Sequence, residues 1–207
     1  VSSRSNCYFQ EAFMIPHHPQ WHWLQELDIG NIQSAQFIFS YPHQPAENYR
    51  NQSYFGGGPL YDIGCYGILA GCLLFDGLPE VVSAIAKMDD KFDVEKQVDV
   101  ILRWPNGEIL NLTVSSDAVL CQSFHVLGDK GWAKLNVPVN PPEVTHAYWS
   151  KGGLEKGTKI SFPNCNQYKL MVDDFVKQAI SGRTSDFSIS RVVIKAINDI
   201  QSKLIYL

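Results

Sequence analysis

Val98–Val114, with the sequence VDVILRWPNGEILNLTV, decides the class of fold. Apolar side chains alternate with other residues along both arms of this stretch, as they do in a strand with one buried face. Pro105-Asn106-Gly107 lies between the arms and is a turn sequence, because Asn-Gly readily adopts positive φ angles. The stretch therefore predicts a β-hairpin within an antiparallel sheet.

The residues on both sides of this hairpin extend the pattern into a larger sheet. We predict further strands over residues 6–14, 32–41, 81–86, 120–127, 132–137, 144–149 and 159–162, and helices over residues 19–27, 59–75, 167–180 and from 188 onward. Because most strands follow one another without intervening helices, the order favours a meandering sheet. The predicted class is α+β, with an open, mostly antiparallel sheet and helices packed on one face.

The composition narrows the classes of function. The chain has 207 residues, of which 45% are apolar, so it can bury a substantial core. A net charge of −4 and the lack of a basic run disfavour a nucleic-acid partner. The longest apolar stretch is shorter than the roughly 18 residues that span a membrane. Five scattered cysteines without a C-x-x-C pair favour a reducing cytoplasm over a disulfide framework or a zinc site.

Both ends of the chain have the pattern of an interrupted polypeptide. Val1 precedes a strand-like run, and Leu207 lies in an apolar helical pattern that no glycine or proline ends. The sequence also has no G-x-G-x-x-G motif, which is the phosphate-binding turn of a dinucleotide-binding fold. We therefore expect the chain to be part of a longer polypeptide.

Residues 56–66, GGGPLYDIGCY, are the most informative for function. The three glycines allow the backbone to approach a ligand closely. Asp62 and Tyr66 lie four residues apart, which places them on one face of a helix near its start. Asp62 is the only charged residue between Arg50 and Asp76, so its carboxylate needs a partner or an open cleft.

Two interpretations of these residues stay open on residue types alone. In the first, the positive end of the helix and a nearby cation lower the pKa of the Tyr66 hydroxyl and make it a proton shuttle. In the second, Asp62 caps the helix and Tyr66 fills the core. The adjacent Cys65 has no activating His or Lys near it in the sequence, so we do not expect it to act as a nucleophile.

A histidine cluster, Pro16–His22, is a second candidate site. His18 and His22 have the i, i+4 spacing that can chelate a metal, but no Asp, Glu or Cys with ligand spacing completes a set. We therefore predict no metal site. His17 and His18 remain candidates for hydrogen bonding to a polyol, with simple loop packing as the alternative.

Two polar clusters are further candidates for substrate binding. Asn48 and Arg50 precede the glycines in a polar, aromatic segment whose side chains suit sugar hydroxyls, with a solvated loop as the alternative. Gln167 and Tyr168 begin the helix predicted over residues 167–180, with a helix cap followed by an exposed turn as the alternative.

Taken together, these motifs resemble the GFO/IDH/MocA family of oxidoreductases, and most of all its branch of xylose and trans-dihydrodiol dehydrogenases. The resemblance covers nearly the whole chain. It rests on residues 11–14, 18–20, 56–58, 62–66, 104–107, 128–131, 166–168 and 174–175. It implies that residues 1–13 are the last strand of a Rossmann domain, and that residues 14–207 form a substrate-binding and oligomerisation domain whose open sheet packs against a partner subunit.

The resemblance also implies an activity. Members of the family transfer a hydride between a carbinol carbon of a sugar or cyclic diol and NAD or NADP, with help from the lysine of a Glu-Lys-Pro motif. Asp62 and Tyr66 correspond to catalytic residues, and Glu11 to a cofactor-binding one. The motif lysine and the phosphate-binding loop are absent from this chain, so we expect it to be inactive alone. Pro16 stands where related sequences commonly carry arginine, which leaves the substrate class open.

Two other functions remain as alternatives. The chain could be a non-catalytic binding or oligomerisation module with the same fold, since Phe37, Phe39 and Tyr41 would form an interface if that face of their strand were exposed. The second alternative is a metal-dependent enzyme that uses the histidine cluster.

Overall fold

The computed structural model describes residues 7–153, 157–162 and 164–207. Its strands are β1 (Ile32–Ser40), β2 (Glu80–Met88), β3 (Glu95–Arg103), β4 (Ile109–Ser115), β5 (Cys121–Gly128), β6 (Trp132–Leu135), β7 (Thr145–Ser150), β8 (Thr158–Phe162) and β9 (Ile205–Tyr206). Its α-helices are α1 (Pro19–Glu26), α2 (Cys65–Cys72), α3 (Gln167–Ile180) and α4 (Ser188–Ser202). The strands form one sheet in the order β8-β7-β6-β5-β1-β4-β3-β2-β9.

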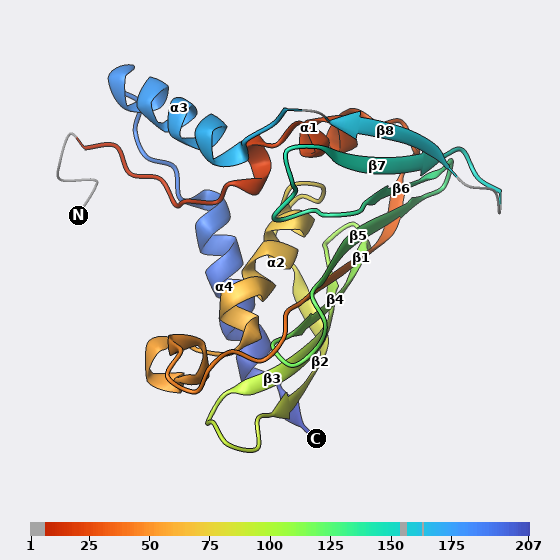
Figure 1. The fold of residues 1–207 in the computed structure, drawn as a ribbon. Coiled ribbons are helices and arrows are strands. Elements are labelled where there is room, and N and C mark those ends of the chain that lie inside the picture. Colours follow the sequence, from red (N-terminus) through yellow and green to blue (C-terminus); the bar gives the residue numbers. More distant parts are fainter. Residues whose placement is uncertain (1–6, 154–156, 163) are drawn as a thin grey trace.

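Helices cover one face of this sheet, and the described residues place none on the other (Figure 1). α2 packs between the sheet and α4. α1 lies on the same face of the sheet and packs against β5. The predicted α+β class, with an open, mostly antiparallel sheet and helices on one face, is confirmed.

The strands do not follow the simple meander that their order in the sequence suggested. β1 lies in the middle of the sheet, parallel to β4 and antiparallel to β5. A parallel pair needs a long crossover connection, and the chain between β1 and β4 provides one that includes α2. Two antiparallel groups, β2–β4 and β5–β8, then flank β1.

The helix-facing side of β1 is the centre of the core. Phe37 is fully buried, and Phe39 and Tyr41 are nearly so. α2 approaches this side closely at Gly67, where a Cβ atom would collide with the Phe37 ring. The hypothesis that these aromatic residues form an exposed interface is therefore wrong, because all three are buried on the face that carries the helices.

The strand predicted over residues 6–14 is not formed in its described part. Residues 7–14 are neither helix nor strand, while residues 1–6 of the predicted Rossmann strand lie outside the described residues. A strand needs a neighbour with which to share backbone hydrogen bonds. Here the N–H of Phe9 donates instead to Oγ of Ser185, at 2.7 Å.

The helix predicted over residues 59–75 begins differently from an ordinary α-helix. A wider π-helical turn, Leu60–Gly64, comes first, and α2 continues from it. Turns of this kind occur often at functional sites, because they change the direction of the side chains that they carry. Asp62 lies within this turn.

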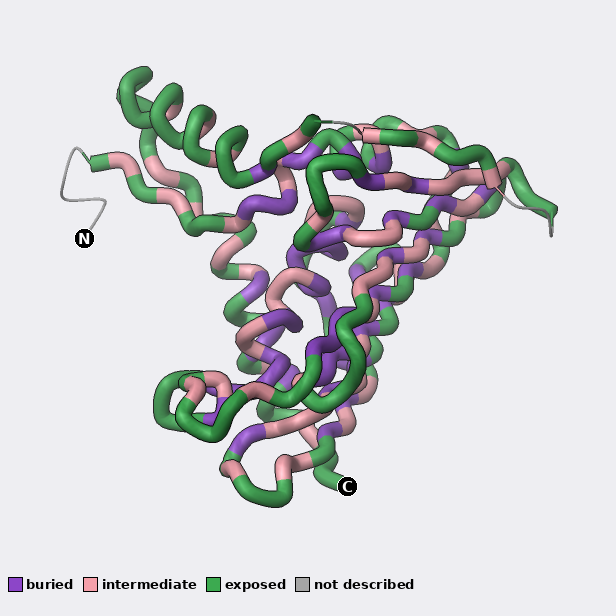
Figure 2. The backbone as a smooth tube through the Cα atoms, viewed as in Figure 1, coloured by how far each residue is buried: buried purple, intermediate pink, exposed green. Residues whose placement is uncertain are grey.

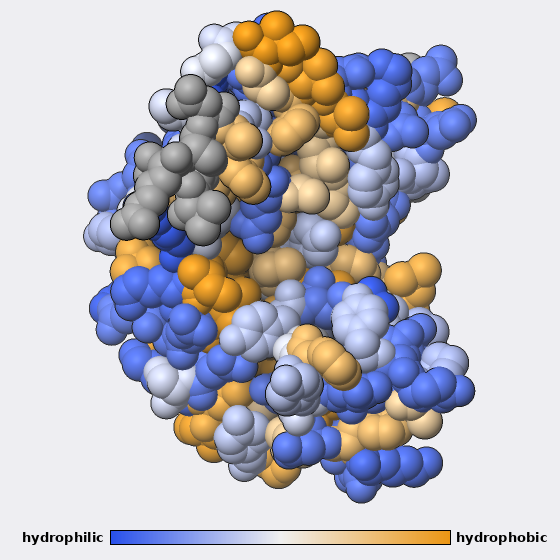
Figure 3. Space-filling view, turned by 90° about the vertical axis from the view of Figure 1, so that its left-hand side faces the viewer, coloured by the Kyte–Doolittle hydropathy of each residue, from blue (hydrophilic) through white to orange (hydrophobic). Residues whose placement is uncertain are grey.

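α3 stands apart from the body of the molecule and is mostly exposed (Figure 2). Its described contacts are made mainly with the short turn Ile15–His17. The apolar side chains that it exposes are Leu170, Val172, Phe175, Val176 and Ile180. Figure 3 views this side of the molecule, which is hollowed in the middle and has apolar residues gathered at its upper end, where Figure 1 places α3.

Candidate active site

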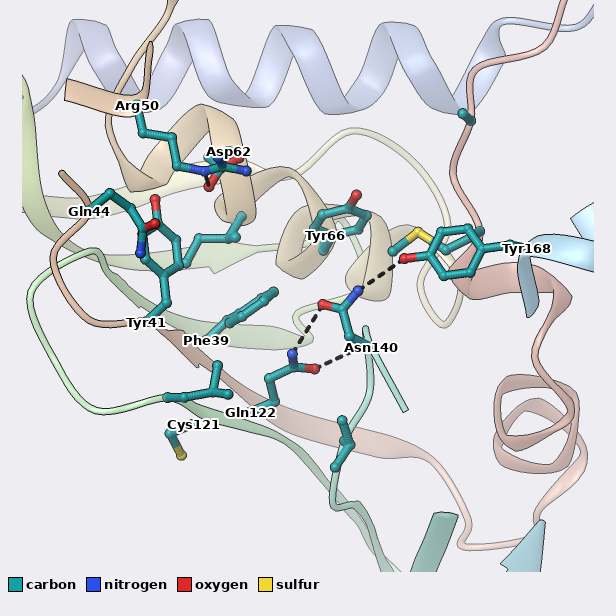
Figure 4. Close-up of a pocket in the computed structure, with 15 residues that line it drawn as sticks. Phe39, Tyr41, Gln44, Arg50, Asp62, Tyr66, Cys121, Gln122, Asn140 and Tyr168 are labelled. Atoms are coloured by element: carbon teal, nitrogen blue, oxygen red, sulfur yellow. Dashed lines mark hydrogen bonds and ion pairs between the residues drawn. The ribbon is translucent and has the colours of Figure 1, made fainter. Parts of the chain in front are cut away.

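A cavity of about 720 Å³ opens beside the adjacent ends of β1 and β5, on the helix-bearing side of the sheet (Figure 4). Six segments of the chain contribute to it. The lining residues are Ala12, Met14, Phe39, Tyr41, Gln44, Arg50, Asp62, Ile63, Tyr66, Leu120, Cys121, Gln122, Val137, Asn140 and Tyr168.

The charged part of the lining is one ion pair. Nε of Arg50 donates to Oδ2 of Asp62 at 2.7 Å. The loop places Arg50 through Asn48, whose side chain accepts the Arg50 backbone N–H and caps the short turn Tyr49–Asn51. The guanidinium also lies 4.6 Å from the centre of the Tyr49 ring. Arg50 is thus the partner that an isolated carboxylate in an apolar helix requires.

Tyr41 lies beside this pair at the end of β1. Its hydroxyl is buried and has no hydrogen-bond partner among the described residues. Burial and the neighbouring Asp62 carboxylate raise the pKa of Tyr41, so its phenol stays protonated. The Tyr41 hydroxyl therefore lies beside the Asp62 carboxylate, which is an acceptor within its reach.

Tyr66 lines the cavity one turn along from Asp62 and is half-buried. The interpretation in which it is sealed in the core does not hold. The expectation of a lowered pKa is also wrong, because burial first, and then the neighbouring Cys65, Tyr168 and Asp62, raise the pKa of Tyr66 to about 12. The Tyr66 hydroxyl is therefore protonated at neutral pH.

A chain of amides completes another wall of the cavity. The Gln122 side chain hydrogen-bonds Asn140, and Asn140 hydrogen-bonds the Tyr168 hydroxyl (Figure 4). Tyr168 itself is half exposed. Of the residues that the sequence proposed for substrate binding, Arg50 and Tyr168 line the cavity, and Asn48 supports it from behind.

The other predicted binding residues lie elsewhere. His18 is fully buried, and its Nδ1 accepts the N–H of Gln20 as the cap of α1. Burial lowers the pKa of His17, which sits in the preceding turn and outside the cavity lining. Gln167 is also buried, and its Nε2 donates to the carbonyl of Val139 at 2.7 Å. These side chains support the fold around the cavity instead of reaching into it.

The histidine cluster is not assembled as a metal site. His18 faces the core while His22 is exposed. Across the described ranges, no group of three or more His, Cys, Asp or Glu side chains is placed to hold a metal ion. The same ranges contain no helix that is both long and apolar enough to cross a bilayer.

The sequence analysis did not assign four polar or reactive lining residues to the site: Tyr41, Gln44, Cys121 and Gln122. A fifth, Asn140, lies in a loop that the strand pattern passed over. Tyr41 had a signal, since a hydroxyl on the buried face of a predicted strand needs a partner. The others had none, because each reaches the cavity only through contacts distant in the sequence.

The cavity lining and the triple glycine do not fit the phosphates of a nicotinamide dinucleotide. The one cation of the cavity is already paired. The backbone N–H groups of Gly57 and Gly58 are already used, since they donate to the carbonyls of Gln52 and Arg50 at 3.0 and 2.9 Å. A Cβ on Gly58 would also collide with the Glu95 carboxylate. Glu11 lines a separate groove of about 90 Å³ against α3. None of these described regions therefore offers a free phosphate-binding group.

Comparison with known proteins gives a consistent result. Residues 21–134 match the model of the GFO/IDH/MocA C-terminal domain. The chain is 28% identical to an uncharacterized oxidoreductase of Rhizobium meliloti, over 96% of this chain and 63% of that protein. It is 28% identical to a trans-1,2-dihydrobenzene-1,2-diol dehydrogenase of Mus musculus, over 66% of this chain and 42% of that protein.

The fold also has a counterpart among solved structures. KijD10, a 3-ketoreductase from Actinomadura kijaniata in complex with NADP and TDP-benzene, superimposes with a TM-score of 0.86 and 24% identity, over 98% of this chain and 65% of that one. The chain thus spans less than two thirds of the length of each of these proteins.

Proposed function

The chain belongs to the GFO/IDH/MocA family, and from this premise we propose that it is the substrate-binding part of an NAD(P)-dependent oxidoreductase acting on a sugar or cyclic diol. The observation that carries the proposal is the meeting of Asp62 and Tyr66 in one open cavity, with Asp62 held by Arg50. The nicotinamide would carry out the hydride transfer. The domain that binds it would correspond to the third or more of the relatives' length that this chain does not cover.

Tyr66 is the proton donor of this site. With its pKa raised to about 12, the hydroxyl is fully protonated at neutral pH and can give a proton to the oxygen of a carbonyl that is being reduced. Oxidation of an alcohol needs the opposite change, and a cation brought by the other domain would lower the pKa toward the working range. A free tyrosine is already protonated at neutral pH, so the raised pKa makes Tyr66 a weaker acid, and such a cation would bring its pKa nearer the working range for either direction.

Asp62 and Arg50 position the substrate. The Arg50 side chain is about one-third exposed and that of Asp62 less, so the pair lies at the cavity wall with carboxylate lone pairs left to accept substrate hydroxyls. Tyr66 and Tyr168, which carry hydroxyl donors, line the same cavity. Donors and acceptors in alternation are what a polyhydroxylated molecule requires.

The substrate is a neutral one. Arg50 and Asp62 are the only charged residues in the lining, and they compensate each other. A phosphate group would find no free cation in this cavity, and its desolvation would not be repaid. A free sugar or diol therefore fits better than a nucleotide-linked sugar, although KijD10 was solved with TDP-benzene.

The face that carries α3 is where the nucleotide-binding domain docks. Residues 7–14 run along this helix, with the Tyr8 and Phe175 rings 5.3 Å apart. α3 contributes Tyr168 to the cavity lining, and its exposed Val172 and Phe175 line a groove that shares Ala12 with the cavity. A domain placed there would cover apolar surface and close the site.

The test is a pair of tyrosine variants in the polypeptide that contains both domains. Tyr66→Phe should lower kcat for reduction of a keto-sugar or oxidation of a diol by about 10²-fold or more, the scale of a lost general acid. Tyr61→Phe is the matched control, because Tyr61 lies in the π-helical turn just before α2, and its hydroxyl donates to Oε1 of Gln201 at 3.1 Å, outside the cavity lining. Equal activities of the two variants would overturn the role of Tyr66.

A non-catalytic module is the second candidate. The uncovered face of the sheet partly exposes Ile101 and Leu127, and Trp132 is the cross-strand neighbour of Leu127. An apolar face of this kind suits contact with a second copy of the chain. The two candidates agree on a homo-oligomer and differ on chemistry. Stable oligomers, with no turnover by the two-domain polypeptide on aldoses, keto-sugars or diols, would favour the module.

A cytoplasmic location is part of the proposal. All five cysteines are free, and Cys7 and Cys121 are exposed, which suits a reducing compartment.

A further inference from the structure

Gln122, Asn140 and Tyr168 form a hydrogen-bonded relay that crosses three elements of the fold. Gln122 is on β5, Asn140 is in the loop that precedes β7, and Tyr168 is in the first turn of α3. Nε2 of Gln122 donates to Oδ1 of Asn140, and Nδ2 of Asn140 donates to the Tyr168 hydroxyl oxygen, each at 3.2 Å (Figure 4). All three side chains line the cavity.

The direction of this relay is set by the backbone. Oε1 of Gln122 accepts the N–H groups of Val139 and Asn140, both at 3.1 Å. A backbone N–H can only donate, so this end of the Gln122 amide has to be its oxygen and the other end its NH₂. Asn140 must then turn its oxygen toward Gln122, which leaves its NH₂ for Tyr168. Two backbone donors thus determine the orientation of both amides.

The orientation of Asn140 makes the Tyr168 hydroxyl oxygen a hydrogen-bond acceptor. A phenol has one hydrogen to donate, and here its oxygen accepts from Asn140. Among the described residues, the Tyr168 hydroxyl donates to no acceptor, and the half-exposed side chain lines the cavity, so its hydrogen is available there. Tyr168 also lies near enough to Tyr66 to contribute to the raised pKa of Tyr66. The two phenols therefore face the same cavity.

We propose that Gln122 and Asn140 are positioning residues that orient the Tyr168 hydroxyl as a hydrogen-bond donor to an oxygen of the substrate. This rests on the proposed function, and it refines the substrate class to molecules that present two acceptor oxygens, one to Tyr66 and one to Tyr168. The second oxygen is a hydroxyl, ether or carbonyl oxygen on a carbon that does not react.

Two nearly isosteric substitutions reverse the relay. Asn140→Asp offers only acceptors, so the Tyr168 hydroxyl turns to donate to Asp instead of to the substrate. Gln122→Glu keeps the acceptor for the two backbone N–H groups but loses the donor, which forces Asn140 to flip and present its oxygen to Tyr168. Each variant removes the same hydrogen bond to the substrate without shortening a side chain.

We expect each variant of the two-domain polypeptide to raise KM by about 3- to 10-fold with little change in kcat, the effect of one lost hydrogen bond. Asn140→Ala should raise KM less, because the Tyr168 hydrogen stays free. A merely structural role predicts the opposite order, since Asp is closer to Asn in shape than Ala is.

A double-mutant cycle separates polarity from added charge. In a Tyr168→Phe background, Asn140→Asp should have no further effect on KM, because the donor is already gone. A further rise in KM there would assign the effect to charge and overturn the relay.

A spectroscopic readout tests the relay without turnover. In the Raman difference between each protein and its Tyr168→Phe counterpart, the tyrosine doublet distinguishes an accepting phenol from a donating one. The chain should show an accepting Tyr168, and the Asn140→Asp variant a donating one. An unchanged doublet overturns the relay, whereas a changed doublet in a polypeptide that turns over no sugar or diol refutes the proposed function alone.

Discussion

His18 with His22 and Asp62 with Tyr66 are two pairs with the same four-residue spacing, each beside a proline near the start of a helix, and the fold places them in different environments. His18 is fully buried and His22 is exposed, so the first pair is divided between the core and the solvent. Asp62 and Tyr66 both line the cavity.

The difference comes from where each pair begins relative to its helix. His18 is the cap of α1, with extended backbone angles of φ −81° and ψ 133°, so it does not share a helical face with His22. Asp62 lies inside the π-helical turn that leads into α2, so its spacing to Tyr66 is a helical one. Residue spacing predicts a shared face only when both residues are inside the helix.

The largest effect expected from this comparison is acid destabilisation through His18. Burial lowers the pKa of His18 to about 4, below the ordinary value of 6.5. The unfolded chain therefore binds the proton first, so the free energy of unfolding falls as the pH falls from about 6.5 to about 4, by as much as about 3 kcal/mol. Urea unfolding at pH 7 and near pH 4 measures this loss.

Two asparagine variants sharpen the measurement. His18→Asn keeps an acceptor for the N–H of Gln20 and removes the titrating group, so the acid loss should shrink. His22→Asn, at an exposed position of the same helix, should leave the acid loss as it is. An acid loss that persists in full in His18→Asn would show that His18 is not its source.

A smaller effect is expected on the cavity side of the comparison. Arg50→Gln leaves the Asp62 carboxylate, whose side chain is only 15% exposed, without its cation. We expect a loss of about 1–3 kcal/mol in the free energy of unfolding. Arg103→Gln is the control, because Arg103 and Glu80 are more than half exposed and their pair should contribute nothing measurable. Similar losses in the two variants would contradict a special role for Asp62.

The smallest effect is a shift in the titration of one phenol. The pKa of Tyr66 is raised to about 12, whereas a free tyrosine titrates near 10. The difference in ultraviolet absorbance between the chain and its Tyr66→Phe variant should therefore begin to rise well above pH 10. A step centred at pH 10 would mean that Tyr66 is more exposed than the cavity geometry indicates.

Much of the fold follows from local patterns. The alternation in Val98–Val114 predicts the hairpin that becomes β3 and β4, and the buried face of β1 follows from the positions of Phe37 and Phe39. Local patterns do not show that β1 lies between β4 and β5, because that pairing depends on residues about 75 positions or more apart in the chain.

The features of the cavity also separate into those that follow from local patterns and those that do not. Asp62 and Tyr66 could be found from the sequence, because their spacing and the lack of nearby charge are local properties. The Arg50–Asp62 pair, the unpartnered hydroxyl of Tyr41 and the relay through Gln122 and Asn140 could not. The sequence by itself determined which side chains turn inward, since periodicity sets the face of each strand and helix. Only the tertiary structure decided which inward side chains meet, because distant segments are brought together by the packing of the whole core.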